Sequence, residues 1–236
     1  MRGIVEVYQK TRKRPDLFWN TYVCRPPAAA IVYLLSGTRV TPNQVTLVAW
    51  VVASAAAALV VILPGYWGLL AAILLFEFSY VLDCVDGMLA RLRGIQSPAG
   101  HLLDFLMDEI KAFTLLGAVA VRLFREQSDA RFLLLGIGGL VCLASGIALT
   151  TFQRRPEIVA VLASAAPAAP PAAQSPIKMA IGLVERVAKF LIHYPSYILY
   201  AALAGRIEIY FYPYIAVNAV YALRALAWVA LRFGRR

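Results

Sequence analysis

The chain has 236 residues, of which 61% are hydrophobic and only 15% are charged, yet its formal net charge is +10. Soluble domains are about 45–50% apolar and about 25% charged, so the composition argues against a soluble globular protein, a disordered chain and a secreted module built on disulfides. Nucleic-acid binding does not account for the basic excess, because it requires far less apolar surface. We therefore predict a membrane protein with no nucleic-acid partner.

The first 40 residues are predicted to lie at the membrane surface. Residues 1–26 are basic and carry interleaved aromatic side chains, a composition typical of an interface where rings lie among headgroups and cations face anionic lipid. The apolar stretch 28–36 is too short to cross a bilayer and is predicted to form an interfacial or re-entrant helix. We treat residues 1–40 as a cytoplasmic interfacial segment and residues 41–236 as the membrane domain.

From residue 41 onward the sequence predicts six transmembrane helices, because crossing the hydrocarbon core takes roughly 20 predominantly apolar residues. Thr41 is a good N-cap and Pro42 is favoured at the first helical position, so the first helix begins there. The fifth span is the least clearly marked. Residues 190–203 are too short to cross the bilayer alone, and the helical-looking residues 177–189 before them are needed to lengthen the span. The fold class is therefore all-α, a polytopic membrane protein with an N-terminal interfacial amphipathic helix. The predicted spans are 45–63, 66–89, 98–124, 132–152, 177–203 and 207–231.

The orientation follows from the basic residues. Most of the 23 Lys and Arg residues fall in segments that share one side if the N-terminus is cytoplasmic, and basic loops stay on the cytoplasmic side. We expect an integral protein of a bacterial-type inner (plasma) membrane, with both termini in the cytoplasm. The polar, basic start argues against a cleavable signal peptide, and the odd number of cysteines predicts free thiols.

Two further segments are predicted to have a structural role rather than a catalytic or binding role. Residues 156–176 are rich in Ala and Pro and are predicted to form a flexible connector. The cluster Gly136-Ile137-Gly138-Gly139 lies inside an apolar span with no strand before it, so it is predicted to let two helices approach closely rather than to bind a nucleotide.

Six of the 13 acidic residues fall in the second and third predicted spans. An ionisable side chain at membrane depth costs at least about 2.5–3.5 kcal/mol, so each such residue is a functional hypothesis. Helical spacing places four of these acids, together with small residues, on one face of each helix, since positions three and four apart are neighbours. The residues on these faces are Asp83, Asp86, Gly87 and Ala90 in the helix predicted over 66–93, and Gly100, Asp104 and Asp108 in the helix predicted over 98–124.

A short turn joins these two helices, with Gly94 to end one and Ser97-Pro98 to begin the next. The helices are therefore antiparallel neighbours, and their acidic faces converge near the cytoplasmic surface. Four carboxylates need a counter-charge that Arg91 alone does not supply, so we infer bound cations. All-oxygen ligands suit Mg²⁺ or Mn²⁺, in a pair. Small residues leave a slot beside them that is suited to a diphosphate.

The structural alternative is a buried acid–base network that only fixes helix packing. Packing alone has no need of uncompensated carboxylates, which argues against this alternative.

Residues 83–108 read D-C-V-D-G-M-L-A-R-L-R-G-I-Q-S-P-A-G-H-L-L-D-F-L-M-D. The segment resembles, at every fixed position, the D-x2-D-G-x2-A-R-x8-G-x3-D-x3-D signature of the CDP-alcohol phosphotransferase (CDP-alcohol phosphatidyltransferase) family. The six-span layout and the short helix before the first span extend the resemblance over most of the chain. The patterns around Arg25-Pro26 and Thr41-Pro42-Asn43-Gln44 resemble, more weakly, members that transfer inositol phosphate.

The resemblance implies that an alcohol hydroxyl attacks a CDP-linked phosphate and releases CMP. It implies that Asp83, Asp86 and Asp104 hold divalent metals, and that Asp108 helps to ligate them and acts as the general base. It also implies a homodimer active in phospholipid biosynthesis. The residues that it assigns to the CDP portion are Gly87, Ala90, Arg91 and Gly100.

The acceptor alcohol is less well defined by the sequence. Arg154 and Arg155 follow the fourth span on the cytoplasmic side, where they are candidates to bind a phosphorylated polyol; the alternative is simple positive-inside anchoring. Lys111 lies one turn after Asp108 and either joins the acceptor site or neutralises the acids. Lys189 is a further acceptor candidate.

The leading hypothesis is transfer of the phosphatidyl group of CDP-diacylglycerol to a small polar alcohol such as inositol phosphate or glycerol phosphate. Within the same family, the alternative is transfer of a CDP-linked head group to a lipid alcohol. An intramembrane prenyltransferase would show two separated, similar aspartate clusters. A cation transporter would place acids in the outer half of the spans as well.

Overall fold

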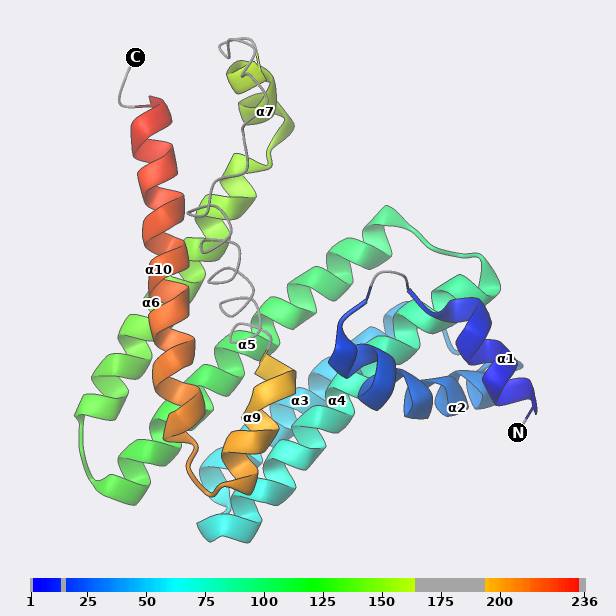
Figure 1. The fold of residues 1–236 in the computed structure, drawn as a ribbon, viewed down its shortest axis with the longest axis horizontal. Helices are drawn as coiled ribbons and strands as arrows, with labels where there is room; N and C mark the ends of the chain where they lie inside the picture. The colour runs from blue at the N-terminus through cyan, green and yellow to red at the C-terminus, as the bar shows by residue number, and fades with distance from the viewer. Residues whose placement is uncertain (1, 14–15, 164–193, 234–236) are drawn as a thin grey trace, which may run out of the picture.

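The computed structural model describes residues 2–13, 16–163 and 194–233, and every regular element in these ranges is helical (Figure 1). The all-α prediction is confirmed for this part of the chain. The elements are α1 (Arg2–Thr11), the π-helix η1 (Asn20–Cys24), α2 (Arg25–Leu35), α3 (Pro42–Ile62), α4 (Gly65–Arg93), α5 (Pro98–Gln127), α6 (Arg131–Gln153), α7 (Pro156–Ala163), α9 (Tyr194–Leu203) and α10 (Glu208–Phe233).

Among the described helices, α3, α4, α6 and α10 are long and apolar enough to cross a membrane. This agrees with a polytopic membrane protein. Helix α5 has 30 residues and also has the necessary length, but it contains several charged side chains. Of the predicted fifth span, α9 forms the end, and residues 177–193 lie outside the described ranges. The total of six spans stays a prediction.

Helices α3, α4 and α5 form one packed unit whose turns follow from local sequence. Thr41 and Gln44 form a capping box at the start of α3, in which each side chain accepts a hydrogen bond from the other residue's backbone N–H. Gly94 ends α4 with a φ of +64°, a conformation that favours glycine. Ser97 then caps α5 by accepting a hydrogen bond from the Gly100 N–H at 3.0 Å. The predicted turn is confirmed, and we call this end of the unit the pocket end.

The opposite end, which we call the far end, is closed by a buried arginine of α5. Arg122 is 3% exposed and donates hydrogen bonds to the carbonyl oxygens of Val60, Leu63 and Gly65, where α3 passes into α4. It also pairs with Glu126 one turn later. The last carbonyls of α3 have no partner within their own helix, so this side chain satisfies groups that would otherwise be left unpaired.

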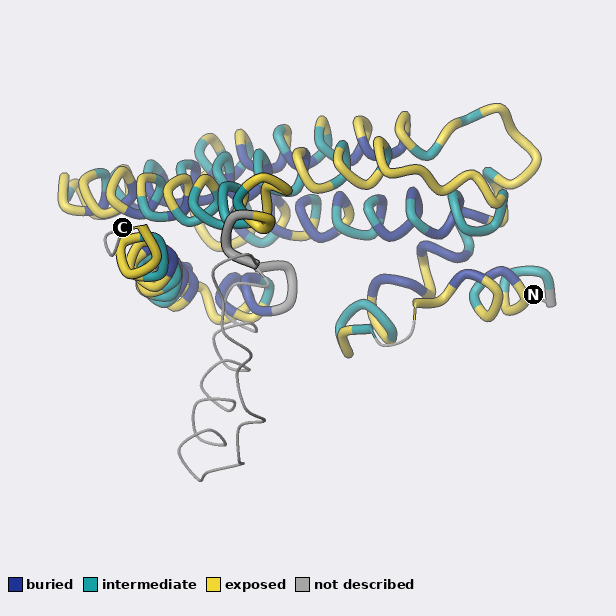
Figure 2. The backbone as a smooth tube through the Cα atoms, turned by 90° about the horizontal axis from the view of Figure 1, so that it is seen from above, coloured by how far each residue is buried: buried dark blue, intermediate teal, exposed yellow. Residues whose placement is uncertain are grey.

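Helices α6 and α10 lie side by side and diverge from the α3–α5 unit toward α7 (Figure 1). Glycines bring α6 close to its neighbours, because a Cβ at Gly136 would lie 2.4 Å from the Ala120 Cβ of α5, and one at Gly139 would lie 2.7 Å from Ile215 of α10. The predicted close approach is therefore confirmed. Figure 2 shows exposed and buried positions alternating along the long helices, as expected where one face of each helix packs inside the molecule.

The N-terminal segment packs at the pocket end, where α1 and α2 contact α4 (Figure 1). The stretch predicted over 28–36 falls almost entirely in helix α2, whose buried side includes Ala28, Ala29 and Val32; its interfacial, amphipathic role stays a prediction. Asp16 and Arg25 form a buried ion pair in this segment. Burial is the largest single influence on Asp16 and opposes its ionisation, but the charge and hydrogen bond of Arg25, together with hydrogen bonds from Leu17 and Asn20, outweigh it and hold the pKa of that carboxyl below its usual value.

The structure describes only part of the predicted connector over residues 156–176. The first residues of the predicted connector form helix α7, and the rest of the connector lies outside the described ranges. The boundary at residue 40 between an interfacial segment and a membrane domain stays a prediction. Cys24, Cys84 and Cys142 are all free, as predicted.

Candidate active site

Three of the predicted acids converge between α4 and α5. One carboxylate oxygen from each of Asp83, Asp104 and Asp108 lies within 4.8 Å of the other two. Asp104 and Asp108 are four residues apart and therefore share a face of α5, and the turn at the pocket end sets this face against Asp83 of the antiparallel α4. The spacing argument from the sequence is confirmed for these three residues.

Asp86 occupies a different position. It is 5% exposed and accepts a hydrogen bond from the Thr46 hydroxyl of α3. Thr46 thus fixes the carboxylate of Asp86, which is not one of the three that converge. The role of Asp86 as a metal ligand stays a prediction. The sequence contains no signal for this contact, because Thr46 and Asp86 are 40 residues apart and a threonine in an apolar helix commonly bonds to its own backbone.

Lys111 is the internal counter-charge of the cluster. Its side chain is 1% exposed, and its ammonium group donates to Asp83 at 2.5 Å and to Asp108 at 3.2 Å. These contacts agree with the neutralising role that the sequence left open, and acceptor binding by Lys111 stays a prediction. One ammonium faces three converging carboxylates, so the cluster retains an excess of negative charge.

The donor chemistry of this cluster fits a divalent cation. All of its donors are carboxylate oxygens, which Mg²⁺ and Mn²⁺ prefer over nitrogen and sulfur. Three carboxylate oxygens within 4.8 Å of one another can face one ion, since each would lie about 2.0–2.6 Å from it. Asp83, Asp104 and Asp108 are the residues that would hold the ion.

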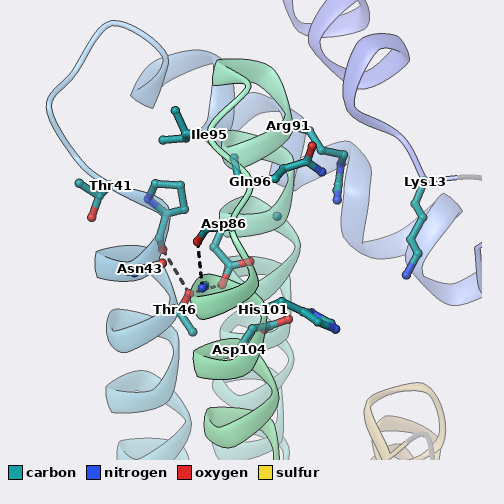
Figure 3. Close-up of a pocket in the computed structure, with 15 residues that line it drawn as sticks. Lys13, Thr41, Asn43, Thr46, Asp86, Arg91, Ile95, Gln96, His101 and Asp104 are labelled. Atoms are coloured by element: carbon teal, nitrogen blue, oxygen red, sulfur yellow. Dashed lines mark hydrogen bonds between the residues drawn. The ribbon is translucent and has the colours of Figure 1, made fainter. Parts of the chain in front are cut away.

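A cavity of about 430 Å³ adjoins the acids at the pocket end. It lies between the start of α3, the end of α4, the turn and the start of α5, and Figure 3 shows the acids Asp86 and Asp104 on its wall. All four residues that the family resemblance assigns to the CDP portion line this cavity, together with these two acids. These four are Gly87, Ala90, Arg91 and Gly100.

Small side chains keep this cavity open. A Cβ at Gly100 would lie 3.2 Å from the amide oxygen of Asn43 on α3 and 3.1 Å from the hydroxyl of its own helix cap, Ser97. A Cβ at Gly87 would lie 3.4 Å from the guanidinium of Arg91. A larger residue at either position would enter the space between the helices.

Several residues of the cavity wall were not assigned to the site by sequence reasoning. Thr41 and Asn43 were read only as helix-start and family-pattern residues, and Gln96 lies in the turn. Lys13 comes from the N-terminal segment, and His101 from the first turn of α5. A basic residue before the first helix carries no signal of its own, because basic flanks are common in membrane proteins.

The structure does not bring the predicted acceptor arginines to this cavity. Arg154 and Arg155 are exposed and lie where α6 ends and α7 begins, and Figure 1 shows that this end of α6 stands apart from the turn between α4 and α5. Lys189 lies outside the described residues. Acceptor binding by these three residues stays a prediction.

Comparison with known proteins identifies the family. The sequence matches the CDP-alcohol phosphatidyltransferase family over residues 39–212, which include the carboxylate cluster and all of the cavity wall except Lys13. A curated relative, the bifunctional IPC transferase and DIPP synthase of Archaeoglobus fulgidus, is 31% identical over 109 residues. This match covers 46% of the present chain and 20% of the relative, so the chain spans about a fifth of that protein's length. The chain therefore belongs to the CDP-alcohol phosphatidyltransferase family.

Proposed function

We propose that this protein is an integral-membrane enzyme that transfers the phosphatidyl group of CDP-diacylglycerol to a small polar alcohol and releases CMP. The observation that carries the proposal is the meeting of two groups of residues at one place. The carboxylates of Asp83, Asp104 and Asp108 converge, and the neighbouring cavity is lined by Arg91 and small residues of the same signature. Family membership supports a CDP-linked donor.

Exposure distinguishes the carboxylates in the proposed reaction. The side chain of Asp108 is 42% exposed, whereas that of Asp83 is 8% exposed. An incoming hydroxyl reaches Asp108 more readily, so we assign Asp108 as the general base and Asp83 as a residue held inside the cluster. Lys111 contacts both and keeps the two carboxylates together.

In the proposed step, Asp108 accepts the proton of the alcohol as its oxygen forms a bond to the phosphorus that carries the diacylglycerol group. The bond from that phosphorus to the oxygen shared with CMP breaks, and CMP leaves with the electron pair. Arg91 lies at the cavity wall, where its guanidinium can pair with phosphate oxygens of the donor. A divalent cation held by the carboxylates would neutralise the diphosphate and stabilise the departing CMP.

We further propose a phosphorylated acceptor such as inositol phosphate. The relative's name, an IPC transferase and DIPP synthase, supports group transfer as the class of reaction, and the N-terminal sequence patterns favour an acceptor with a phosphate. We also propose Mg²⁺ or Mn²⁺ as the cation, a homodimer, and an active site on the cytoplasmic side of a bacterial-type inner membrane.

The test is an acceptor screen with the purified full chain. The protein is incubated with Mg²⁺ and CDP-diacylglycerol, and CMP release is measured with inositol phosphate, glycerol phosphate, inositol, serine or no acceptor. We expect release that depends on a phosphorylated acceptor. A parallel reaction with CDP-choline and diacylglycerol tests the reversed arrangement of donor and acceptor. The absence of CMP release with every pair would contradict the proposed function.

A further inference from the structure

A residue from outside the matched family region lines the candidate active site. Lys13 follows α1 and lines the same cavity as Arg91, His101 and Asp104. Figure 3 shows its side chain extending from the N-terminal segment toward the side of the cavity where Arg91 and His101 lie. The N-terminal segment therefore forms part of the cavity wall.

The position of Lys13 is set by contacts of the folded segment. The Arg91 side chain donates from Nε to the carbonyl oxygen of Thr11 at 2.7 Å, two residues before Lys13. The Tyr8 hydroxyl donates to the carbonyl oxygen of Thr21 at 3.0 Å, which ties α1 to η1. Val7 and Thr11 are buried. Arg91 thus reaches the cavity and holds the segment that carries Lys13.

The charges around Lys13 are arranged for an anionic ligand. Its side chain is exposed, and within the described part of the chain it makes no hydrogen bond or ion pair with another residue. Arg91 and Lys13 provide two cationic side chains to a cavity whose acidic wall includes Asp86 and Asp104. A phosphate group placed between these walls would face the carboxylates of Asp86 and Asp104 on one side and two cationic side chains on the other.

We propose that Lys13 binds a phosphate group of a substrate in this cavity, which makes the N-terminal segment part of the substrate-binding site. This inference rests on the proposed function, which supplies two sources of that phosphate: the diphosphate of the CDP-linked donor and the phosphate of the acceptor. An ammonium group on a flexible stem pairs with phosphate as a point charge and suits either source.

The experiment compares Lys13→Ala with Arg12→Ala in the full chain of residues 1–236. Arg12 is the adjacent basic residue, is also exposed, and is not part of the cavity wall, so it matches Lys13 in charge and in possible contact with anionic lipid. Two quantities are measured for each variant: the Kd of CDP in the presence of Mg²⁺, by titration calorimetry, and the KM of inositol phosphate.

We expect Lys13→Ala to raise one of these two constants by about tenfold, the effect of losing one charge-assisted hydrogen bond at a partly exposed site. A change in the CDP Kd identifies the donor diphosphate, and a change in the acceptor KM identifies the acceptor phosphate. Lys13→Arg should keep both constants within about threefold because it retains the charge. Arg12→Ala should leave both within about twofold.

The inference is overturned if Lys13→Ala and Arg12→Ala change both constants equally, because Lys13 would then be an ordinary surface cation. This failure is distinct from failure of the proposed function. If the unmodified enzyme releases CMP but the two variants behave alike, only the role of Lys13 is wrong. If the unmodified enzyme releases no CMP with any acceptor, the proposed function is wrong, and a CDP Kd unchanged by Lys13→Ala then also overturns the inference.

Discussion

Two buried basic residues on the same helix make different kinds of contact, Lys111 midway along α5 at the carboxylate cluster and Arg122 near the end of α5. Lys111 and Arg122 lie on α5, both at 3% exposure or less. At the carboxylate cluster Lys111 is bound by the carboxylates of Asp83 and Asp108. At the far end Arg122 is bound mainly by backbone carbonyl oxygens where α3 passes into α4, with Glu126 as its ion-pair partner.

The difference between the two places lies in their charge balance. At the far end Arg122 meets the carboxylate of Glu126 and several neutral carbonyls, and Arg125 donates to the carbonyl oxygen of Val61, so both cations are bound by the fold itself. At the carboxylate cluster one cation meets three converging carboxylates. Buried charge without a partner is costly, so the remaining negative charge of the cluster favours a ligand site over a role in packing alone.

The largest expected effect is that of Asp108→Asn. Asparagine preserves the shape of the side chain but does not accept a proton, so CMP release should fall by at least about a hundredfold. The thermal unfolding temperature should stay near that of the unmodified protein, because Lys111 keeps its bond to Asp83. Undiminished CMP release in this variant would show that Asp108 is not the base.

Lys111→Met tests the charge imbalance of the carboxylate cluster. The substitution leaves Asp83 buried without its cation, so we expect a loss of about 3–5 kcal/mol in the free energy of unfolding when metal is removed with EDTA. Adding Mg²⁺ should raise the unfolding temperature more in this variant than in the unmodified protein, because the ion then supplies the missing positive charge. An equal or smaller Mg²⁺ effect in the variant would contradict the assigned metal site.

Arg122→Met tests the far end of the α3–α5 unit. The change leaves the carbonyls of Val60, Leu63 and Gly65 without this donor, and we expect a loss of about 3 kcal/mol in the free energy of unfolding. The KM values and the turnover per folded molecule should stay unchanged, since the side chain lies at the far end. A change in KM without a change in stability would show that the role of Arg122 is not purely structural.

Gly136→Ala, compared with Gly138→Ala, tests packing near the far end. A Cβ at Gly136 would lie 2.4 Å from the Cβ of Ala120, two residues before Arg122, whereas a Cβ at Gly138 has open space around it. We expect Gly136→Ala to lower the free energy of unfolding by about 1–3 kcal/mol. Gly138→Ala should not lower it. Both variants gain the same helix propensity, so the difference between their unfolding temperatures isolates the helix contact.

Sequence reasoning worked where the structure depends on local spacing. The convergence of Asp83, Asp104 and Asp108 followed from helical periodicity and from the turn between Gly94 and Ser97, because two helices joined by so short a connection must be neighbours. The predicted packing role of the glycine cluster also followed from its place in an apolar span. Sequence reasoning did not indicate that Arg154 and Arg155 lie away from the cavity, because the path of α6 relative to α5 depends on packing that no local pattern describes; their role in acceptor binding stays a prediction.

By itself, the sequence determined that this is an apolar, helical protein whose acids gather on two adjacent helices, since composition, periodicity and short turns constrain these features directly. Only the tertiary structure decided which partners those acids have. The sequence left open whether Lys111 contacts the acids or an acceptor, and only the structure showed its contacts with Asp83 and Asp108. For the contacts of Thr46 and Lys13 the sequence contained no signal at all. Their positions depend on contacts between segments tens of residues apart, and such contacts are fixed only when the helices pack together.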